Sequence, residues 1–309
     1  CATTEMDRVF FANSGAEANE AAIKLARLYG HQQAIKNPHI VVMQNAFHGR
    51  TMATLSATGS RKVQAGFEPL VSGFVRAPYN DIAALEAIAE NNRKVVAILV
   101  EPVQGEAGIV IPKPGYLSAL RKICDQNNWL LMLDEVQTGM ARSGKMFAHQ
   151  HEAVLPDVMT LAKALGNGVP VGACIARGKA AEVFQPGNHG STFGGNPLAS
   201  RAAYTVLTSM LENRIADNAA QRGAQLVNAL QQGLADNPRV LEVRHLGLLV
   251  AVEMRIPCQP LVTQALQQGL LINVTAQRTI RLLPPLILSE TQTGEIADRL
   301  ITCINQFTE

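Results

Sequence analysis

Lys163 is the residue whose type and surroundings suggest chemistry most directly. It lies between an apolar run and a glycine-rich turn, within residues 160–170. Burial lowers the pKa of a lysine, and the resulting neutral amine is the nucleophile that forms a Schiff base with a carbonyl. Taken alone, a lysine flanked by alanine and leucine is more simply explained as a helix residue whose ammonium group reaches solvent. Other parts of the chain must decide between these two interpretations.

A polar turn containing Ser14 and Gly15 follows the apolar residues 9–12. Ser14 can cap the helix expected at residues 21–29, and Glu17, three positions later, can complete a capping box. Gly15 lets a ligand approach the backbone closely, and the N–H groups of a helix start bind anions such as phosphate. A well-capped helix without a ligand explains the same pattern. The turn is neither a P-loop nor a GxGxxG motif.

Two further groups would suit a flat, charged ring. Phe47, beside His48, could stack on such a ring, and Arg50 could grip a carboxylate; alternatively Phe47 is a core residue and Arg50 a surface residue. Asp134 ends the apolar residues 129–133, and a buried carboxylate there would keep a pyridine nitrogen protonated. A phosphate-binding turn, a ring stacker, an acid and a reactive amine together predict a pyridoxal phosphate site.

The elements that must position these groups are predicted from apolar runs. Strands are expected at residues 9–12, 40–43, 95–100, 129–133, 158–161 and 169–176, and helices at residues 81–91, 114–127 and 197–212. Continuous apolar strands alternating with helices predict an α/β fold with a mostly parallel central sheet, and a ligand site outside the carboxyl ends of its strands.

A smaller α+β domain is expected at the C-terminal end of the chain. Its helices are expected at residues 216–236 and 261–268 and after Ser289, and its strands at residues 240–243, 248–252, 270–272 and 280–283. We therefore predict a large domain at residues 1–212 and a small domain at residues 213–309.

Composition narrows the choice of partners and compartment. A formal net charge of +2 without a basic stripe argues against nucleic-acid and membrane-surface partners. Five cysteines without a CxxC pair argue for free thiols in the reducing cytoplasm and against a metal site. No apolar run reaches the roughly 18 residues that a membrane span needs. Because the chain opens at Cys1, an N-terminal segment is expected to be missing from it.

The sequence resembles the class III (ornithine-type) aminotransferases of fold-type I, whose fold includes a smaller C-terminal domain. Within that family it is most similar to the members that act on acetylornithine in arginine biosynthesis. The resemblance rests on several stretches in family order: residues 13–20, 47–50, 101–106, 134–139, 161–163, 191–197 and 281–286.

The resemblance implies a role for each cofactor-binding residue. Lys163 would form the internal aldimine with pyridoxal 5'-phosphate and shuttle the proton between the substrate alpha carbon and the cofactor. Asp134 would pair with the ring nitrogen, Gln137 would lie near the 3-hydroxyl group, and Phe47 and His48 would contact the ring. The phosphate would be bound by Ser14, Gly15 and Ala16, together with Thr192 from the partner subunit of a homodimer.

The resemblance also implies how substrates are held. Arg50 would bind a substrate carboxylate, and Glu106 would pair with Arg281 as a switch that masks the arginine for the amino donor and releases it for 2-oxoglutarate. Two positions depart from the family, because Ala141 and His245 stand where glycine is usual. In relatives the missing N-terminal part helps to shape the pocket and the dimer.

The function predicted from these residues is ping-pong transfer of the delta-amino group of N2-acetyl-L-ornithine to 2-oxoglutarate, which yields glutamate. Other amino donors for the same chemistry are N-succinyl-diaminopimelate, succinylornithine, ornithine and 4-aminobutyrate. Two alternatives belong to other classes: a catalytically silent dimerisation or binding module, and a nicotinamide dehydrogenase. Lys163, Asp134 and Gln137 argue against the first, and the lack of GxGxxG argues against the second.

Overall fold

The computed structural model describes residues 1 and 3–307. Contacts between residues divide the chain into two compact units. The first comprises Cys1–Pro102, Pro112–Gln137 and His149–Ser209, and the second comprises Val103–Ile111, Thr138–Ala148 and Met210–Glu309. The domain boundary that the sequence predicts after residue 212 stays a prediction, because contacts alone do not test which part folds independently.

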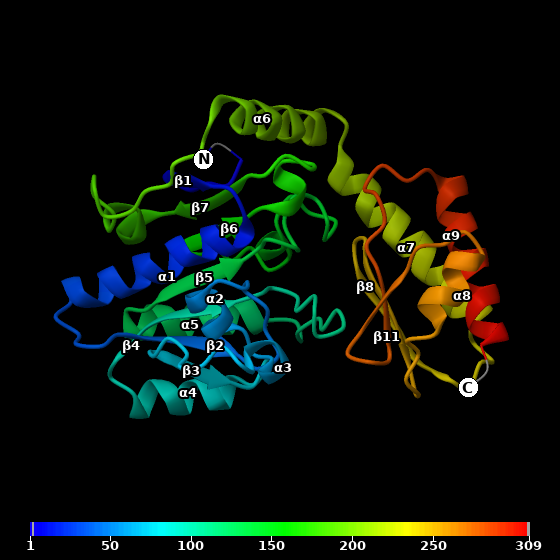
Figure 1. Cartoon of the computed structure of the whole chain (residues 1–309), viewed down its shortest axis with the longest axis horizontal. Coiled ribbons are helices and arrows are strands. Elements are labelled where there is room, and N and C mark those ends of the chain that lie inside the picture. Colours follow the sequence, from blue (N-terminus) through cyan, green and yellow to red (C-terminus); the bar gives the residue numbers. More distant parts are fainter. Residues whose placement is uncertain (2, 308–309) are drawn as a thin grey trace. The chain divides into compact units, whose positions relative to one another are not determined.

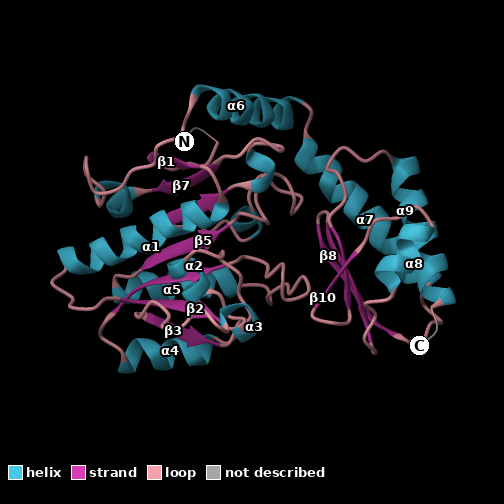
Figure 2. Cartoon of the chain, viewed as in Figure 1, coloured by secondary structure: helices cyan, strands magenta, loops and turns pink. Residues whose placement is uncertain are grey.

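The first unit is built on a seven-stranded sheet (Figures 1 and 2). Its strands are β1 (Arg8–Ala12), β2 (His39–Met43), β3 (Phe74–Ala77), β4 (Val95–Val100), β5 (Leu130–Asp134), β6 (Val158–Leu161) and β7 (Gly172–Ala176). They lie in the order β1-β7-β6-β5-β4-β2-β3. The strands from β3 to β6 pair in parallel, whereas β7 is antiparallel to both β6 and β1. The predicted mostly parallel sheet is confirmed.

Helices cover both faces of this sheet. The helices within residues 1–212 are α1 (Gly15–Gln32), α2 (Met52–Ala57), α3 (Arg61–Gln64), α4 (Ile82–Asn91), α5 (Tyr116–Asn127) and α6 (Pro197–Glu212), with 3-10 turns η1 (Ala148–His151), η2 (Lys163–Leu165) and η3 (Gly178–Glu182). Leu25 of α1 shares a core with Leu99 of β4. Leu120 of α5 shares a different core with the neighbouring residue Ile98. Because β4 is buried on both faces, its sequence is apolar throughout.

The start of α1 differs in one detail from the expected capping box. The Ser14 side chain accepts a hydrogen bond from the Glu17 backbone N–H at 3.2 Å, as expected of an N-cap. The Glu17 carboxylate, however, accepts from the backbone N and side-chain Nδ2 of Asn13, at 3.0 and 2.8 Å. The capping box predicted for Ser14 and Glu17 is therefore wrong in its second half. Glu17 instead fixes the residue that precedes the cap.

The second unit contains a four-stranded antiparallel sheet with the order β10-β11-β9-β8. Its strands are β8 (Val240–Leu246), β9 (Leu249–Met254), β10 (Asn273–Thr275) and β11 (Thr279–Leu282), and its helices are α7 (Ile215–Gly233), α8 (Leu261–Gln267) and α9 (Glu290–Gln306). Leu226 of α7 and Leu300 of α9 share a core with Val252 of β9. Ser289 and Gln292 form a complete capping box at the start of α9.

Some elements differ from the sequence-based predictions. The strand expected at residues 270–272 is wrong, because pairing with β11 begins only at Asn273, and Leu271 is 83% exposed. Strand β3 was not predicted, since it is an edge strand with one buried residue and carries no continuous apolar signal. Among residues 1 and 3–307, no helix is long and apolar enough to cross a membrane.

Candidate active site

Three candidate segments lie at the same edge of the large sheet. Strands β5 and β6 are parallel, with Asp134 opposite Thr160 in their register. Strand β1 runs in the same direction as β6, because each is antiparallel to β7. The turn after β1, the segment after β5 and the lysine after β6 therefore follow the carboxyl ends of strands that point the same way, where open α/β sheets bind ligands.

Gly15 shows how closely these segments approach one another. A Cβ atom at this position would lie 2.8 Å from Val136 Cγ1 and 3.5 Å from Ala162 Cβ. Val136 belongs to the segment after β5, and Ala162 directly precedes Lys163. A Cβ atom at Gly49 would likewise lie 2.9 Å from Ala16 Cβ. The structure thus brings the predicted phosphate turn against the segments that carry Asp134, Lys163 and Phe47.

The Asp134 carboxylate is 5% exposed and is held by three donors. Its Oδ2 accepts hydrogen bonds from Asn19 Nδ2 at 2.7 Å and from His48 Nδ1 at 2.8 Å. Its Oδ1 accepts from the Val136 backbone N–H at 3.1 Å. Because a carboxylate only accepts, the imidazole proton of His48 is assigned to Nδ1. Asp134 is therefore a fixed acceptor at the end of a buried strand.

Two buried polar atoms of the predicted cofactor-binding residues have no hydrogen-bond partner among the described residues. They are His48 Nε2 and Gln137 Oε1. A buried polar group without a partner is costly, and such atoms in a native fold call for an explanation. A polar ring bound next to Asp134 would supply one.

Lys163 begins the 3-10 turn η2 with a left-handed backbone, at a φ of 44°. A residue other than glycine pays about 1–2 kcal/mol for this conformation. Lys163 follows β6, at the edge of the sheet where the other candidate segments meet. The residue is exposed, as the simpler of the two sequence interpretations expected.

The segment after β2 is anchored from several elements. Glu101, directly after β4, accepts a hydrogen bond from the Phe47 backbone N–H at 2.9 Å. Glu20 of α1 accepts from the Thr51 hydroxyl group and from the Ala53 backbone N–H, and so caps α2. Arg50 is exposed, and its guanidinium carbon lies 5.8 Å from the centre of the Phe47 ring.

Thr192 belongs to a loop that lies against the end of β1. Ser191 Oγ accepts hydrogen bonds from Asn13 Nδ2 at 3.2 Å and from the Gly194 backbone N–H at 3.0 Å. A Cβ atom at Gly194 would lie 2.3 Å from the Phe11 carbonyl oxygen, so the close approach requires glycine. The Thr192 side chain itself is exposed.

Glu106 and Arg281 form an ion pair within the second unit. Arg281 NH1 lies 2.7 Å from Glu106 Oε1, and it also donates to the Gly105 carbonyl oxygen at 3.2 Å. Arg281 NH2 donates to Asn273 Oδ1 at 3.1 Å. The Arg281 side chain is 11% exposed and that of Glu106 is 45% exposed. The arginine therefore has neutral partners that hold it in place independently of the carboxylate.

Arg142 ties down the turn that follows β11. Its NH1 group donates to the carbonyl oxygens of Leu248 and Pro284, at 3.2 and 2.6 Å. Burial lowers the pKa of Arg142 to about 10. The neighbouring residue Ala141 is fully buried and has a φ of 68°, a conformation that favours glycine. His245 lies in β8 and is not among the residues with positive φ.

Several of these residues lie within the stretches that carry the family resemblance but have no predicted role there. Asn19 and Glu20 lie in the first turns of α1, and Glu101 follows β4. Val136 lies between Asp134 and Gln137, and Thr160 lies three residues before Lys163. The available signal is a polar side chain on a mostly apolar helix face, as at Asn19, or in an otherwise apolar strand, as at Thr160.

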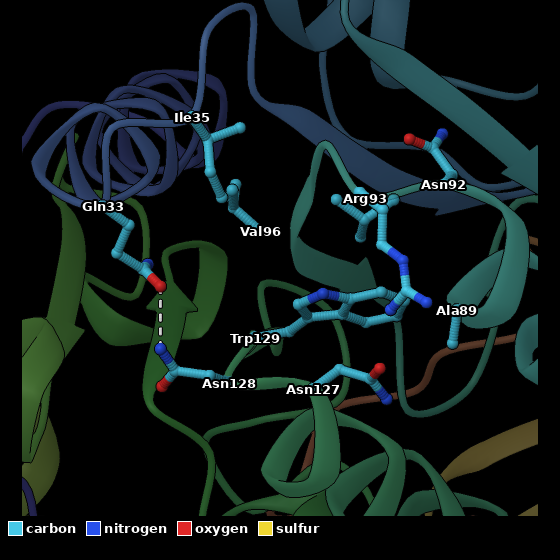
Figure 3. A pocket seen from close by; sticks show the side chains of 10 residues that line it. Gln33, Ile35, Ala89, Asn92, Arg93, Val96, Asn127, Asn128 and Trp129 are labelled. Atoms are coloured by element: carbon cyan, nitrogen blue, oxygen red, sulfur yellow. Dashed lines mark hydrogen bonds between the residues drawn. The ribbon is translucent and has the colours of Figure 1, made fainter.

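Figure 3 shows a cavity elsewhere in the first unit, at the start of β4. It measures about 100 Å³, and Trp129, Arg93 and Asn92 are among the residues that line it. Gln33 and Asn128, joined by a hydrogen bond of 2.7 Å, close one side. Because the cavity lies at the amino ends of the strands, it is separate from the candidate active site.

Comparison with known proteins agrees with this geometry. The sequence pattern of the family described as "Aminotransferase class-III" matches residues 1–304. The acetylornithine aminotransferase of Nitrosomonas europaea is 55% identical over 304 residues, which are 98% of this chain and 77% of the relative. The acetylornithine aminotransferase of Methanothermobacter thermautotrophicus is 44% identical over 295 residues, 95% of this chain and 74% of the relative.

Solved structures show the same fold. The ornithine aminotransferase of Toxoplasma gondii ME49 has a TM-score of 0.95 at 36% identity, covering 98% of this chain and 74% of that chain. The acetylornithine aminotransferase of Elizabethkingia anophelis has a TM-score of 0.87 at 35% identity, covering 99% of this chain and 76% of that chain. Another Toxoplasma gondii structure reports partial occupancy of PLP at its active site. The chain belongs to the class-III aminotransferases.

Proposed function

We propose that this chain uses pyridoxal 5'-phosphate to transfer the delta-amino group of N2-acetyl-L-ornithine to 2-oxoglutarate in arginine biosynthesis. The observation that carries the proposal is the convergence of the Gly15 turn, Asp134 and the Lys163 segment at one edge of the sheet. Relatives named acetylornithine aminotransferase, 44 to 55% identical over nearly the whole chain, support the choice of amino donor.

The residues present fit this cofactor. The N–H groups of Gly15 and Ala16 belong to the first turn of α1, where no intrahelical acceptor exists, and they suit a phosphate. Asp134 offers a fixed carboxylate to a protonated ring nitrogen. Gln137 Oε1 and His48 Nε2 are buried polar atoms that a bound ring would cover. The nicotinamide dehydrogenase alternative finds no support, because the chain belongs to the aminotransferases.

Bound pyridoxal phosphate supplies an aldehyde that takes up the amino group and a protonated ring that draws electrons from the reacting carbon. Lys163 provides the amine that holds this aldehyde, and its Nζ atom then moves the proton at the substrate carbon bearing the amino group. Asp134 keeps the ring nitrogen protonated by pairing with its charge. Phe47 would pack on the ring and orient it.

Charged side chains of this chain hold the two substrates. Arg50 binds the alpha carboxylate of the donor, away from the amine that reacts. Arg281 binds the second carboxylate of 2-oxoglutarate when Glu106 releases it, and is neutralised by Glu106 when the donor is bound. The ion pair would thus let the chain accept a side-chain amine and a dicarboxylate in turn.

A homodimer is part of the proposal, with Thr192 completing the phosphate site of the partner subunit. Exposed apolar side chains at the loop before α6 and on α6 support it: Phe193, Leu198 and Tyr204 are 71%, 73% and 60% exposed. Patches of this kind mark protein contacts. A cytoplasmic location remains a prediction from the sequence.

The proposal is tested with the purified chain, pyridoxal phosphate, 2-oxoglutarate and a panel of amino donors. We expect glutamate formation with the largest kcat/KM for N2-acetyl-L-ornithine, ahead of ornithine, succinylornithine, N-succinyl-diaminopimelate and 4-aminobutyrate. Lys163→Ala should abolish turnover, whereas Lys62→Ala, at an exposed lysine on α3, should not. Equal activity of wild type and Lys163→Ala, or a preference for another donor, would refute it.

A further inference from the structure

A buried chain of hydrogen bonds connects Asp134 to the strand that leads to Lys163. Asn19 of α1 and Thr160 of β6 are each 1% exposed. Asn19 Nδ2 donates to Asp134 Oδ2 at 2.7 Å and to the His48 carbonyl oxygen at 2.8 Å. Asn19 Oδ1 accepts from Thr160 Oγ1 at 2.7 Å. Both amide hydrogens and the amide oxygen of Asn19 are therefore used.

These partners fix the orientation of the amide. If the Asn19 side chain turned by 180°, its oxygen would face the carbonyl oxygen of His48 and the carboxylate of Asp134, which are both acceptors. The Thr160 hydroxyl group donates to the amide oxygen only in the observed orientation. Thr160 lies opposite Asp134 in the β5–β6 register, three residues before Lys163. Asn19 thus joins the acid and the lysine-bearing strand through one rigid group.

The same contacts distinguish the two oxygens of Asp134. Oδ2 already accepts from Asn19 and His48, which fills its two lone pairs. Oδ1 accepts only from the Val136 backbone N–H among the described residues and can accept one further bond. By occupying Oδ2, Asn19 helps to leave Oδ1 as the oxygen that can accept a hydrogen bond from a ligand.

We propose that Asn19 and Thr160 are positioning residues that orient Asp134 so that its Oδ1 atom pairs with the cofactor's ring nitrogen. This inference rests on the proposed function. Asn19 and Thr160 act on the cofactor only through Asp134. Their effect passes through the charge and orientation of Asp134, so they should act on cofactor affinity and on the rate of amino-group removal from the donor.

Asn19→Asp is the sharpest test because it changes charge and donor capacity but not shape. It would place a second carboxylate 2.7 Å from Asp134 Oδ2, and two carboxylates this close share one proton. Asp134 would then be a weaker partner for a protonated ring. We expect at least about a tenfold rise in the dissociation constant for pyridoxal phosphate, because Asp134 loses a hydrogen bond to its charged carboxylate.

The Thr160→Val and Thr160→Ser pair tests the other end of the chain. Valine removes the hydroxyl group and keeps the shape, whereas serine keeps the donor. We expect Thr160→Val to bind the cofactor about threefold or more weakly, which corresponds to a single neutral hydrogen bond. Thr160→Ser should restore binding. Thr293→Val is the matched control, because it removes another buried threonine hydroxyl bond, to the Ser289 carbonyl oxygen of the second unit.

Each full-length variant is measured for cofactor affinity, for the absorption spectrum of the bound cofactor, for the single-turnover rate with N2-acetyl-L-ornithine at saturating cofactor, and for the Tm without cofactor. We expect Asn19→Asp to change the spectrum and slow the turnover at least about tenfold. Thr293→Val should lower the Tm alone. A lower Tm for Asn19→Asp with unchanged affinity, spectrum and rate would overturn the inference.

If Asn19→Asp does not fold, the two Thr160 variants test the inference instead. Identical cofactor affinity and absorption spectrum of Thr160→Val and Thr160→Ser would overturn it. A wild-type chain that fails to bind pyridoxal phosphate or to react with the donor would instead refute the proposed function. The two failures are therefore distinguishable.

Discussion

Replacing Glu106 by glutamine should separate the two half-reactions. The substitution removes the charge that faces Arg281 at 2.7 Å but keeps an amide oxygen in the same place. Arg281 should stay where it is, because the Gly105 carbonyl oxygen and Asn273 Oδ1 also hold it. What changes is the charge balance of the guanidinium group.

The size of the effect follows from exposure. Two unit charges about 4 Å apart interact by about 1 kcal/mol in water and by about 4 kcal/mol near a protein surface. The Glu106 side chain is 45% exposed, so solvent screens the charges and the interaction energy of the pair lies near the lower of these two values. About 1 kcal/mol corresponds to roughly a fivefold change in affinity.

We therefore expect Glu106→Gln to lower the dissociation constant for 2-oxoglutarate about fivefold and to raise that for the acetylated donor by a similar factor. Stopped-flow measurement of each half-reaction separates the two constants. Glu242→Gln is the control, because Glu242 pairs with Arg244 at 2.8 Å in the same unit. Equal changes in both half-reactions, or the same pattern in Glu242→Gln, would refute the switch.

Three other perturbations give distinct outcomes. Asp134→Asn should slow the single-turnover reaction at saturating cofactor by more than about a hundredfold, because breaking a buried charge pair costs about 3–5 kcal/mol. A reaction slowed less than about tenfold would contradict the pairing of Asp134 with the ring nitrogen. Ala141→Val should destabilise the fold by about 2 kcal/mol or more in urea unfolding, since a β-branched residue resists a φ of 68°, whereas Ala141→Gly should stay within about 1 kcal/mol. Burial raises the pKa of Cys174 from 9.0 to about 12, so the folded state binds more protons than the unfolded state in this range, and stability should fall as pH rises from 9 toward 12. Cys174→Ala should make that fall shallower, and an unchanged slope would show that this thiol does not contribute.

The strands and helices that the sequence predicts well are those with a continuous or periodic apolar signal. Strand β4 is buried along its whole length and α1 buries one regular face, so composition and spacing encode both. The direction of β7 could not be predicted from the sequence. A strand buried on both faces has the same apolar pattern whether it runs parallel or antiparallel to its neighbours. The order of helices and strands predicts the small C-terminal domain, but not where β10 begins.

The candidate site was predictable to a similar degree. Asp134 and Lys163 directly follow apolar runs, and this position at strand ends is visible in the sequence. The roles of Asn19 and Thr160 were not visible, because which polar side chains meet across α1 and β6 depends on packing between distant segments. The Glu17 carboxylate likewise binds Asn13 rather than the cap, a difference that backbone geometry decides.

The most direct test of the account is the identity of the residue that binds the cofactor covalently. The chain is loaded with pyridoxal phosphate, treated with borohydride to fix the link, digested and examined by mass spectrometry. We expect the added mass on the peptide containing Lys163, and we expect it to disappear when acetylornithine is added before the reduction. Labelling of a different lysine, or no labelling in a chain that turns over the donor, would contradict it.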